Sequence, residues 1–244
     1  MYEAVIFDCD GVLVDSEIIV IEIERAELAR EGLHYEQGAF IAKFNGLPDK
    51  AFRAAVNADA AERIGRTLPD AFFEAAHVAK DKALRERLQP VPGAAAMLSA
   101  LQAPRAVASS TRKVSLGVKL RETGLWPYLG PHAYSAEEVA RGKPHPDVFL
   151  HASAQIGAEP ARCLAIEDSA NGVRAAVAAG MRPIGFLGGA HCAPGHGDRL
   201  KAAGAVELIA TMAELAERFA ALELGAPESA PQPEAPPSPQ AADR

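Results

Sequence analysis

The segment AVIFDCDG, residues 4–11, joins four apolar residues directly to two aspartates. A short continuous apolar run of this kind is typical of a strand that is buried on both faces of a parallel sheet. Side chains alternate along a strand, so we expect Asp8 and Asp10 to point to one side and Cys9 into the core. Gly11 gives the backbone the freedom for a sharp turn. Two adjacent carboxylates repel each other, which predicts a cation or proton shared at the tip of this strand.

The composition indicates a globular protein and excludes several classes of partner. The chain has 244 residues, 49% of them hydrophobic, enough to bury a sizeable core. Its net charge of −7 argues against nucleic acid or an anionic membrane as the main partner, because both are bound by basic patches. No apolar run approaches the ~18 residues that span a bilayer.

The lack of a secretory signal and the spacing of the cysteines predict a reducing compartment. The N-terminus lacks the basic and apolar regions of a secretory signal. The three cysteines, Cys9, Cys163 and Cys192, have no C-x-x-C spacing and cannot all pair. We therefore expect a cytoplasmic protein. We also expect it to be a monomer or a weak homodimer.

Strand and helix patterns alternate from residue 91 onward. Short buried strands are predicted at 105–108, 133–135, 163–166, 183–186 and 206–209. Helices are predicted at 94–101, 112–123, 170–179 and 212–222, with another that follows residue 147 and ends at 156. This alternation predicts an α/β fold, a Rossmann-like parallel sheet with helices on both faces.

The stretch from residue 16 to 88 shows only helical patterns. A helix over 18–30 follows Asp15 or Ser16 as its N-cap, and further helices are predicted at 36–44, 50–58 and 69–88. We therefore predict a catalytic core of residues 1–15 and 89–224 with an inserted helical domain of residues 16–88. Residues 225–244 are rich in Pro, Ala and Ser and are predicted to be disordered.

Polar residues follow three of the predicted strands, and a lysine opens a nearby helix. They are Asp8 and Asp10, Ser109 and Ser110, Glu167 and Asp168, and Lys143. Each alone has an ordinary explanation, as a helix cap, a turn residue or a solvated lysine. In open parallel sheets, however, ligands bind outside the carboxyl ends of the strands, where all of these residues are expected to converge.

This convergence predicts metal-assisted phosphoryl transfer. Several carboxylates form the hard, oxygen-rich site that Mg²⁺ prefers. One carboxylate can attack phosphorus, and a second can move protons to the leaving oxygen and from water. Lys143 and the metal would neutralise the charge of the transferring group, and Ser109 would donate a hydrogen bond to it.

Four motifs follow one another in the chain: FDCDGVLVDSE, ASS, GKPHPD and IEDSANGVRAA. In this order they resemble the haloacid dehalogenase superfamily. The resemblance covers about residues 3–222 and is to the branch with a helical cap inserted after the first motif. That branch contains phosphoglycolate phosphatases, sugar-phosphate phosphatases and β-phosphoglucomutases.

The resemblance implies a role for each residue of the acidic site. Asp8 would be the nucleophile and a Mg²⁺ ligand. Asp10 would be the general acid and base, with its backbone carbonyl on the metal. Lys143 would stabilise Asp8 and the phosphoryl charge. Asp168 would bind Mg²⁺, and Glu167 would bind it directly or through water.

The resemblance also implies substrate-binding positions. Ser109 would bind the phosphoryl group with help from the backbone N–H of Ser110, and Gly11 would lie beside the substrate. Asn45 and Gly46 on the cap form a candidate specificity loop, although a plain interhelical turn explains them equally well. The cap would close over the site about hinges near residues 14–16 and 89–92.

Departures from the family pattern favour hydrolysis. Asp10 is present, which argues against dehalogenation, and residues 16–24 contain no lysine for phosphonate cleavage. Val20 and Asp49 stand where β-phosphoglucomutases carry a histidine and a basic residue. We therefore predict a Mg²⁺-dependent phosphatase of a small phosphorylated metabolite, a sugar phosphate or sugar-acid phosphate, that works through an aspartyl phosphate. The alternatives are a hexose-phosphate mutase and a non-catalytic module on the same fold.

One further group of residues has the chemistry of a metal site. His191, Cys192 and His196 lie close together in the sequence. They occupy a Gly-rich segment without a fourth ligand, so the sequence does not favour zinc there.

Overall fold

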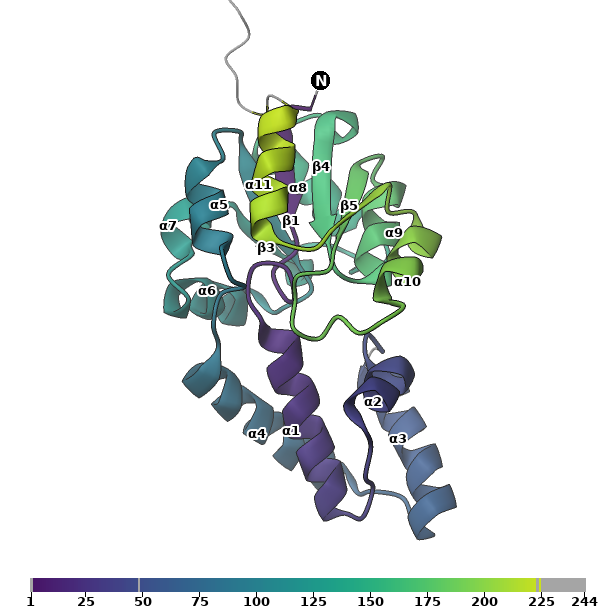
Figure 1. Cartoon of the computed structure of the whole chain (residues 1–244). Coiled ribbons are helices and arrows are strands. Elements are labelled where there is room, and N and C mark those ends of the chain that lie inside the picture. Colours follow the sequence, from purple (N-terminus) through teal and green to yellow (C-terminus); the bar gives the residue numbers. More distant parts are fainter. Residues whose placement is uncertain (1, 48, 223, 225–244) are drawn as a thin grey trace, which may run out of the picture.

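The structure is a computed structural model that describes residues 2–47, 49–222 and 224. Figure 1 shows a layered body of sheet and helices, with a separate group of helices at one end. The predicted disorder of residues 225–244 lies outside the described residues. Within them, every helix is too short or too polar to cross a bilayer, and Cys9, Cys163 and Cys192 are free thiols.

The body contains one six-stranded parallel sheet in the order β3-β2-β1-β4-β5-β6. The strands are β1 (Ala4–Phe7), β2 (Arg105–Ser109), β3 (Ala133–Ser135), β4 (Cys163–Glu167), β5 (Arg182–Phe186) and β6 (Glu207–Ile209). The predicted fold class is therefore confirmed. The first strand lies at the centre, paired with β2 on one side and β4 on the other.

Side chains of β1 alternate between two cores. Val5 and Phe7 pack into a core shared with helices α5 (Ala94–Ala100) and α11 (Met212–Ala221). Ala4 and Ile6 face the opposite core, which contains residues of helices α8 (Asp147–Gln155) and α9 (Ala170–Ala178). The strand is thus buried on both faces, which explains why its sequence reads as a continuous apolar run.

Two helices of the body were not predicted from the sequence. They are α7 (Trp126–Leu129) and α10 (His196–Ala203). The latter follows Gly195, whose φ of 81° is left-handed, and contains Gly197, so its local helix propensity is weak. It is held by packing instead, because Leu200 is buried against Val173 of α9. Helix α6 (Lys113–Glu122) and the short 3₁₀ turns Gly130–His132, Ala136–Glu138 and Pro160–Arg162 complete the body.

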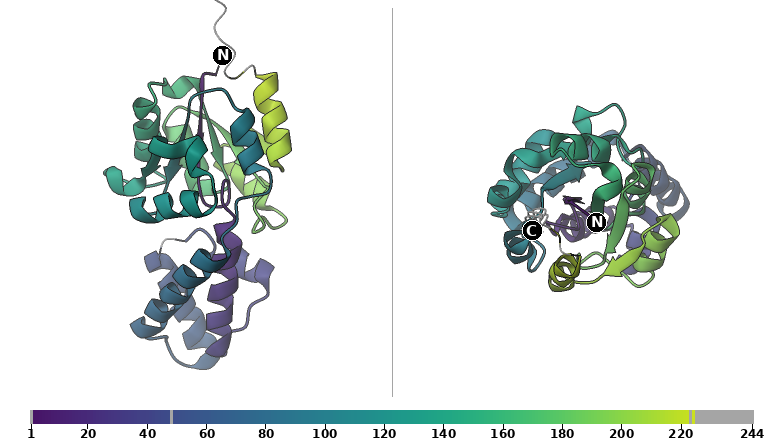
Figure 2. Two further views of the ribbon diagram at one scale, coloured as in Figure 1. Left: turned by 90° about the vertical axis from the view of Figure 1, so that its left-hand side faces the viewer. Right: turned by 90° about the horizontal axis from the view of Figure 1, so that it is seen from above.

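We call residues 16–88 the helical insert. Its helices are α1 (Ser16–Arg30), α2 (Gln37–Phe44), α3 (Asp49–Ile64) and α4 (Asp70–Arg87), and no strand occurs among its described residues. The third helix runs to residue 64, beyond the predicted end at 58. The four helices share an apolar core of their own that includes Phe40, Phe44 and Leu28. Figure 2 shows this group set apart from the sheet layer.

The chain crosses between the body and the insert twice, and the two crossings run side by side. Val14 forms an antiparallel bridge with Pro90. The Asp15 N–H donates to the Gln89 carbonyl at 3.0 Å, and the Val91 N–H donates to the Leu13 carbonyl at 2.9 Å. These segments include the positions expected to form the hinge.

Candidate active site

A cavity of about 770 Å³ separates the carboxyl ends of the strands from the helical insert. The body contributes residues that follow β1, β2, β4 and β5, and the insert contributes residues of α1, α2 and the turn after α2. The lining includes Asp8, Asp10, Ser110, Thr111, Lys119, Lys143, Asp168, His191, His196 and Arg199 from the body, and Ser16, Glu17, Val20, Asn45 and Gly46 from the insert. The site therefore lies where the sheet topology predicted it.

Three carboxylates meet at the end of the paired strands β1 and β4. The Asp8 N–H donates to the Ile166 carbonyl at 2.9 Å, which brings Asp8 beside Glu167 and Asp168. One oxygen atom of each carboxylate lies within 4.8 Å of the others, and all three side chains are buried. Lys143 Nζ lies 2.6 Å from Asp8 Oδ1 and 2.6 Å from Glu167 Oε1. The structure thus brings together four of the predicted site residues.

The electrostatics of this cluster favour a bound cation. Burial raises the pKa of Asp8 well above its usual range; Lys143 opposes this rise, and the charges of Glu167 and Asp168 add to it. The pKa of Glu167 is raised for the same reasons. Burial works to lower the pKa of Lys143, but Asp8 and Glu167 raise it further, so the lysine stays charged. Three buried acids outnumber this one amine, and their oxygen atoms are the donors that Mg²⁺ prefers.

Asp10 has a separate set of partners. Ser16 Oγ and Thr111 Oγ1 donate to its two carboxylate oxygens, each at 2.5 Å, and Lys119 Nζ forms an ion pair with it. Burial works to raise the pKa of Asp10, but Lys119 and the two hydroxyls together lower it. Asp10 is therefore held in its ionised form.

These three partners of Asp10 were missed by the sequence analysis. Ser16 and Thr111 lie inside or beside motifs that were recognised, so their polar side chains were a usable signal. Lys119 lies in the middle of α6 and gave no signal, because only packing of that helix brings its side chain to Asp10.

The predicted phosphoryl-binding serines occupy different places. Ser109 is fully buried, and its Oγ accepts a hydrogen bond from the Thr111 N–H at 3.0 Å. It is not among the residues that line the cavity, whereas Ser110 is. Asn45 and Gly46 line the cavity, whereas Gly11 is not among its lining residues; a Cβ on Gly11 would fall 1.9 Å from Asp168 Oδ2. Gly11 also has a φ of 79°, so both space and backbone favour glycine there.

Two histidines contact Asp168 from the segment after β5. His191 Nε2 lies 3.0 Å from Asp168 Oδ2, and His196 Nε2 donates to the Asp168 backbone carbonyl at 2.5 Å. Burial works to lower the pKa of His191, but the hydrogen bonds and charges of Asp168 and Cys192 raise it to about 11. Burial works to raise the pKa of Cys192, but the hydrogen bonds and charges of the two histidines outweigh this effect, so the pKa is lowered. None of the three was predicted as a site residue.

Glu17, at the start of α1, adds another carboxylate to the cavity wall. Burial raises its pKa to about 7, with the charges of Asp168 and Asp10 adding to the effect. The cavity lining therefore combines the carboxyl groups of Asp8, Asp10, Glu17 and Asp168 with three cations on the body side, Lys119, Lys143 and Arg199.

Comparison with known proteins gives a family match and several similar phosphatases. A family model described as haloacid dehalogenase-like hydrolase matches residues 2–180. The 6-phosphogluconate phosphatase of Escherichia coli is 27% identical over 195 residues, which are 79% of this chain and 86% of that protein. The phosphorylated carbohydrates phosphatase of Thermotoga maritima is 31% identical over 210 residues, 85% of this chain and 94% of that protein.

A solved structure matches the fold over nearly the whole chain. It is that of a conserved haloacid dehalogenase-like protein of unknown function from Agrobacterium tumefaciens, with a TM-score of 0.84 and 36% identity. The match covers 91% of this chain and 100% of that one.

Proposed function

Because the chain belongs to the haloacid dehalogenase-like hydrolase family, we propose that it is a Mg²⁺-dependent phosphatase of small phosphorylated carbohydrates. It is a hydrolase of phosphoric monoesters. The observation that carries the finer proposal is the cluster of Asp8, Glu167 and Asp168 around Lys143, at the base of a cavity of about 770 Å³. The names of the relatives, a 6-phosphogluconate phosphatase and a phosphorylated carbohydrates phosphatase, support a sugar phosphate or sugar-acid phosphate as substrate.

In the first step Asp8 is the nucleophile. One of its carboxylate oxygens forms a bond to phosphorus, and the ester P–O bond breaks. Asp10 must first take up a proton, against the preference that Lys119 gives to its ionised form; it then gives this proton to the leaving oxygen, so the alcohol departs neutral. Mg²⁺ held by Asp8, Glu167 and Asp168 would neutralise charge on the phosphoryl oxygens. Lys143 contributes a fixed positive charge 2.6 Å from Asp8.

In the second step water hydrolyses the aspartyl phosphate. Asp10, now ionised, takes a proton from the attacking water, and the phosphorus–oxygen bond to Asp8 breaks to release inorganic phosphate. The hydrogen bonds from Ser16 and Thr111 hold the Asp10 carboxylate in place for this transfer. Closure of the helical insert over the cavity would exclude bulk water during the first step.

The replacement of Asp8 with Asn tests this proposal. The amide cannot attack phosphorus, so we expect phosphate release from a panel of sugar phosphates to fall on the order of 10³-fold or more. Circular dichroism and thermal melting should stay close to those of the unchanged protein. Full activity in this variant would refute the nucleophile assignment.

Two measurements separate phosphatase from its alternatives. Turnover of a generic aryl phosphate that needs Mg²⁺ and stops on chelation excludes a non-catalytic module. Incubation with β-glucose 1-phosphate and its bisphosphate should give free phosphate and no isomer. The structure places Val20 on the cavity wall, where a mutase is expected to carry its histidine, which supports this outcome.

A further inference from the structure

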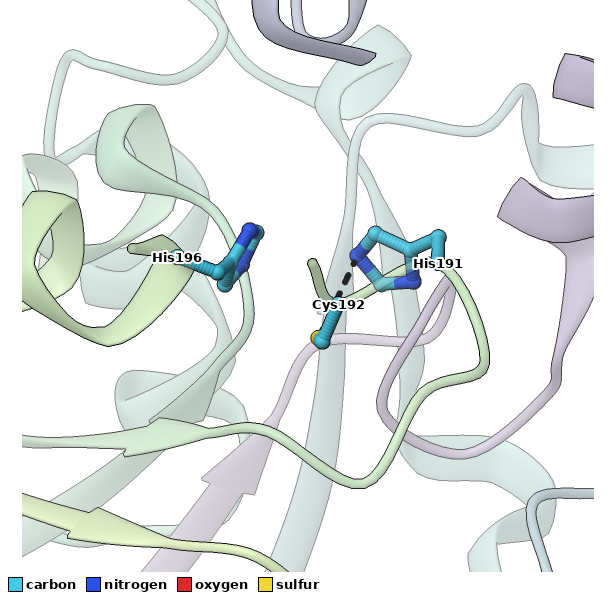
Figure 3. A group of neighbouring side chains, drawn as sticks. All are labelled: His191, Cys192 and His196. Carbon is cyan, nitrogen blue, oxygen red and sulfur yellow. Dashed lines mark hydrogen bonds between the residues drawn. The ribbon is translucent and has the colours of Figure 1, made fainter. Parts of the chain in front are cut away.

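We propose that His191, Cys192 and His196 form a second metal site, which binds a soft divalent ion of the Zn²⁺ type and is distinct from the carboxylate cluster. Figure 3 shows the two imidazole rings on either side of the Cys192 side chain. One donor atom of each residue lies within 4.8 Å of the other two. The proposed phosphatase chemistry gives none of the three a role, although both histidines contact Asp168.

The spacing of the donors fits tetrahedral zinc with little movement. Cys192 Sγ lies 3.7 Å from His191 Nε2. Zinc–sulfur and zinc–nitrogen bonds of about 2.3 and 2.0 Å place such donors about 3.5 Å apart in a tetrahedral site. The two rings are nearly perpendicular, with centroids 5.4 Å apart, so both can direct a nitrogen toward one ion.

His196 has the hydrogen bond that orients a metal ligand. Its Nε2–H donates to the Asp168 backbone carbonyl at 2.5 Å, which leaves the lone pair on Nδ1. A ring N–H bound to a carbonyl is the usual way in which proteins fix the tautomer of a metal-binding histidine. Nδ1 accepts from the Arg199 guanidinium at 3.0 Å, and Arg199 is exposed, so its side chain can turn into solvent when an ion binds.

His191 can offer Nε2 to a metal once that nitrogen loses its proton. The ring is 1% exposed, and its Nδ1 is buried without a hydrogen-bond partner among the described residues. Nε2 lies 3.0 Å from Asp168 Oδ2 and 3.7 Å from Cys192 Sγ, so an ion bound to Nε2 would take the place of the proton in the Asp168 contact. That proton goes to solvent, and the proton on Nδ1 stays.

The donor set decides which ion is bound. One thiolate and two imidazoles suit Zn²⁺ and exclude Mg²⁺, whereas the three carboxylates have the opposite preference. Binding would release the Cys192 thiol proton to solvent. His191 and His196 line the cavity, which gives the ion a path in and leaves the fourth coordination position to water or a ligand.

Cobalt provides a direct test of this site. The metal-free protein, given excess Mg²⁺ to fill the carboxylate cluster, is titrated with Co²⁺. We expect the near-ultraviolet charge-transfer band of a Co²⁺–thiolate bond, saturating at about one ion per chain and displaced by Zn²⁺. Absence of the band from the unchanged protein would overturn the proposal.

Variants assign the band to its ligands. Cys192→Ser should abolish it and weaken Zn²⁺ binding at least about 10-fold, and His196→Gln should weaken binding comparably. Cys163→Ser, which alters a free thiol fully buried elsewhere in the body, should leave the band unchanged. Asp8→Asn should also retain it, which separates this site from the phosphatase site. A band that survives in Cys192→Ser, or that is lost in Asp8→Asn, would contradict the assignment.

Discussion

Asp8 and Asp10 lie two positions apart on one loop, and their surroundings shift their pKa values in opposite directions. Asp8 shares Lys143 with Glu167 and lies beside Asp168, so burial and like charge prevail and its pKa rises. Asp10 pairs with Lys119 and accepts hydrogen bonds from two hydroxyls, so its pKa falls. The proposed difference in role, a metal-dependent nucleophile and a proton carrier, would thus arise from neighbouring groups rather than from residue type.

Lys119 sets the pKa of Asp10, and its removal should change the pH profile. An alkyl phosphate needs a protonated Asp10 to release its alcohol, so activity declines as pH rises above the pKa of that acid. In Lys119→Met the pKa of Asp10 rises, and the descending limb of kcat/KM should move to higher pH by about one unit.

The control for this prediction keeps the charge. Lys119→Arg should leave the descending limb where it is. An aryl phosphate, whose leaving group needs no proton, should show no such shift in Lys119→Met. A limb that stays in place or moves to lower pH with the sugar phosphate would contradict the role of Lys119.

Glu17 makes the stability of the protein depend on pH. Its pKa is about 7 in the folded protein, above the usual value for Glu, so the folded state holds its proton more tightly. The stability that Glu17 contributes is fully present below its pKa in the unfolded chain and is lost as the pH rises to about 7. Glu17→Gln should therefore raise the free energy of unfolding by about 2 kcal/mol at pH 8, and by less at pH 5.

Urea unfolding at both pH values measures this difference. Glu62→Gln, on an exposed part of α3, should change the free energy of unfolding by no more than about 0.5 kcal/mol at either pH. An equal gain at pH 5 and pH 8 for Glu17→Gln would show that ionisation is not the cause.

At the scale of elements, the start of α9 positions a predicted metal ligand. Ser169 caps this helix by accepting from the Gly172 N–H at 3.0 Å, and its own Oγ and N–H donate to Glu167 Oε2 at 3.0 and 3.2 Å. Glu167 is fully buried between Lys143 and this turn. The helix terminus therefore fixes the direction of the Glu167 carboxylate. The Ser169 side chain also gives a hydrogen-bond partner to an N–H group in the first turn of the helix.

Gly172 leaves the space that Glu167 occupies. A Cβ at this position would fall 1.8 Å from Glu167 Oε1. Gly172→Ala must therefore displace the carboxylate, and we expect activity to fall at least about 10-fold with a higher Mg²⁺ requirement. Titration of phosphate release with Mg²⁺ measures both effects.

Gly38 in α2 is the matched control, since a Cβ there would meet nothing within 4 Å. Gly38→Ala should stabilise the protein by about 0.5 kcal/mol without altering Mg²⁺ dependence. Unchanged activity and Mg²⁺ requirement in Gly172→Ala would show that Glu167 tolerates displacement.

At the scale of the whole molecule, the cavity lies between two bodies with separate cores. The residues proposed to handle the phosphoryl group come from the sheet end, and residues such as Asn45 and Gly46 come from the helical insert. The two bodies are joined by paired crossings at Val14–Pro90 and Asp15–Gln89. This division predicts that the body performs the chemistry and that the insert selects the substrate.

Asn45 tests this division of labour. Asn45→Ala removes a polar side chain from the insert wall, so KM for the preferred sugar phosphate should rise about 10-fold. Turnover of a small aryl phosphate, which does not reach that wall, should remain nearly unchanged. Lys82→Ala, on an exposed part of α4, should leave the kinetics with both substrates unchanged.

An equal loss of activity toward both substrates in Asn45→Ala would show that the insert contributes to the chemistry itself. Steady-state kinetics with the two substrates separate these outcomes.

Much of the fold and the acidic site followed from sequence patterns. Local backbone preferences and burial produce the apolar run of β1 and the alternation of strands and helices after residue 91. They also explain why acids and a lysine stand at the ends of predicted elements, and the parallel topology then places the strand ends together. Asp8, Glu167, Asp168 and Lys143 were predicted in this way, and the structure brings them together. The family resemblance is confirmed by the family model that matches residues 2–180.

Other features were decided only by the tertiary structure. The ion pair of Lys119 with Asp10 joins residues 109 positions apart. His191 reaches Asp168 from a turn, and His196 reaches it from the start of helix α10, whose glycines weaken the helical pattern in the sequence. Periodicity reports which face of an element is buried; it does not report which side chains meet across elements. AVIFDCDG therefore determined where the site lies, and packing around it determined what each of its two aspartates can do.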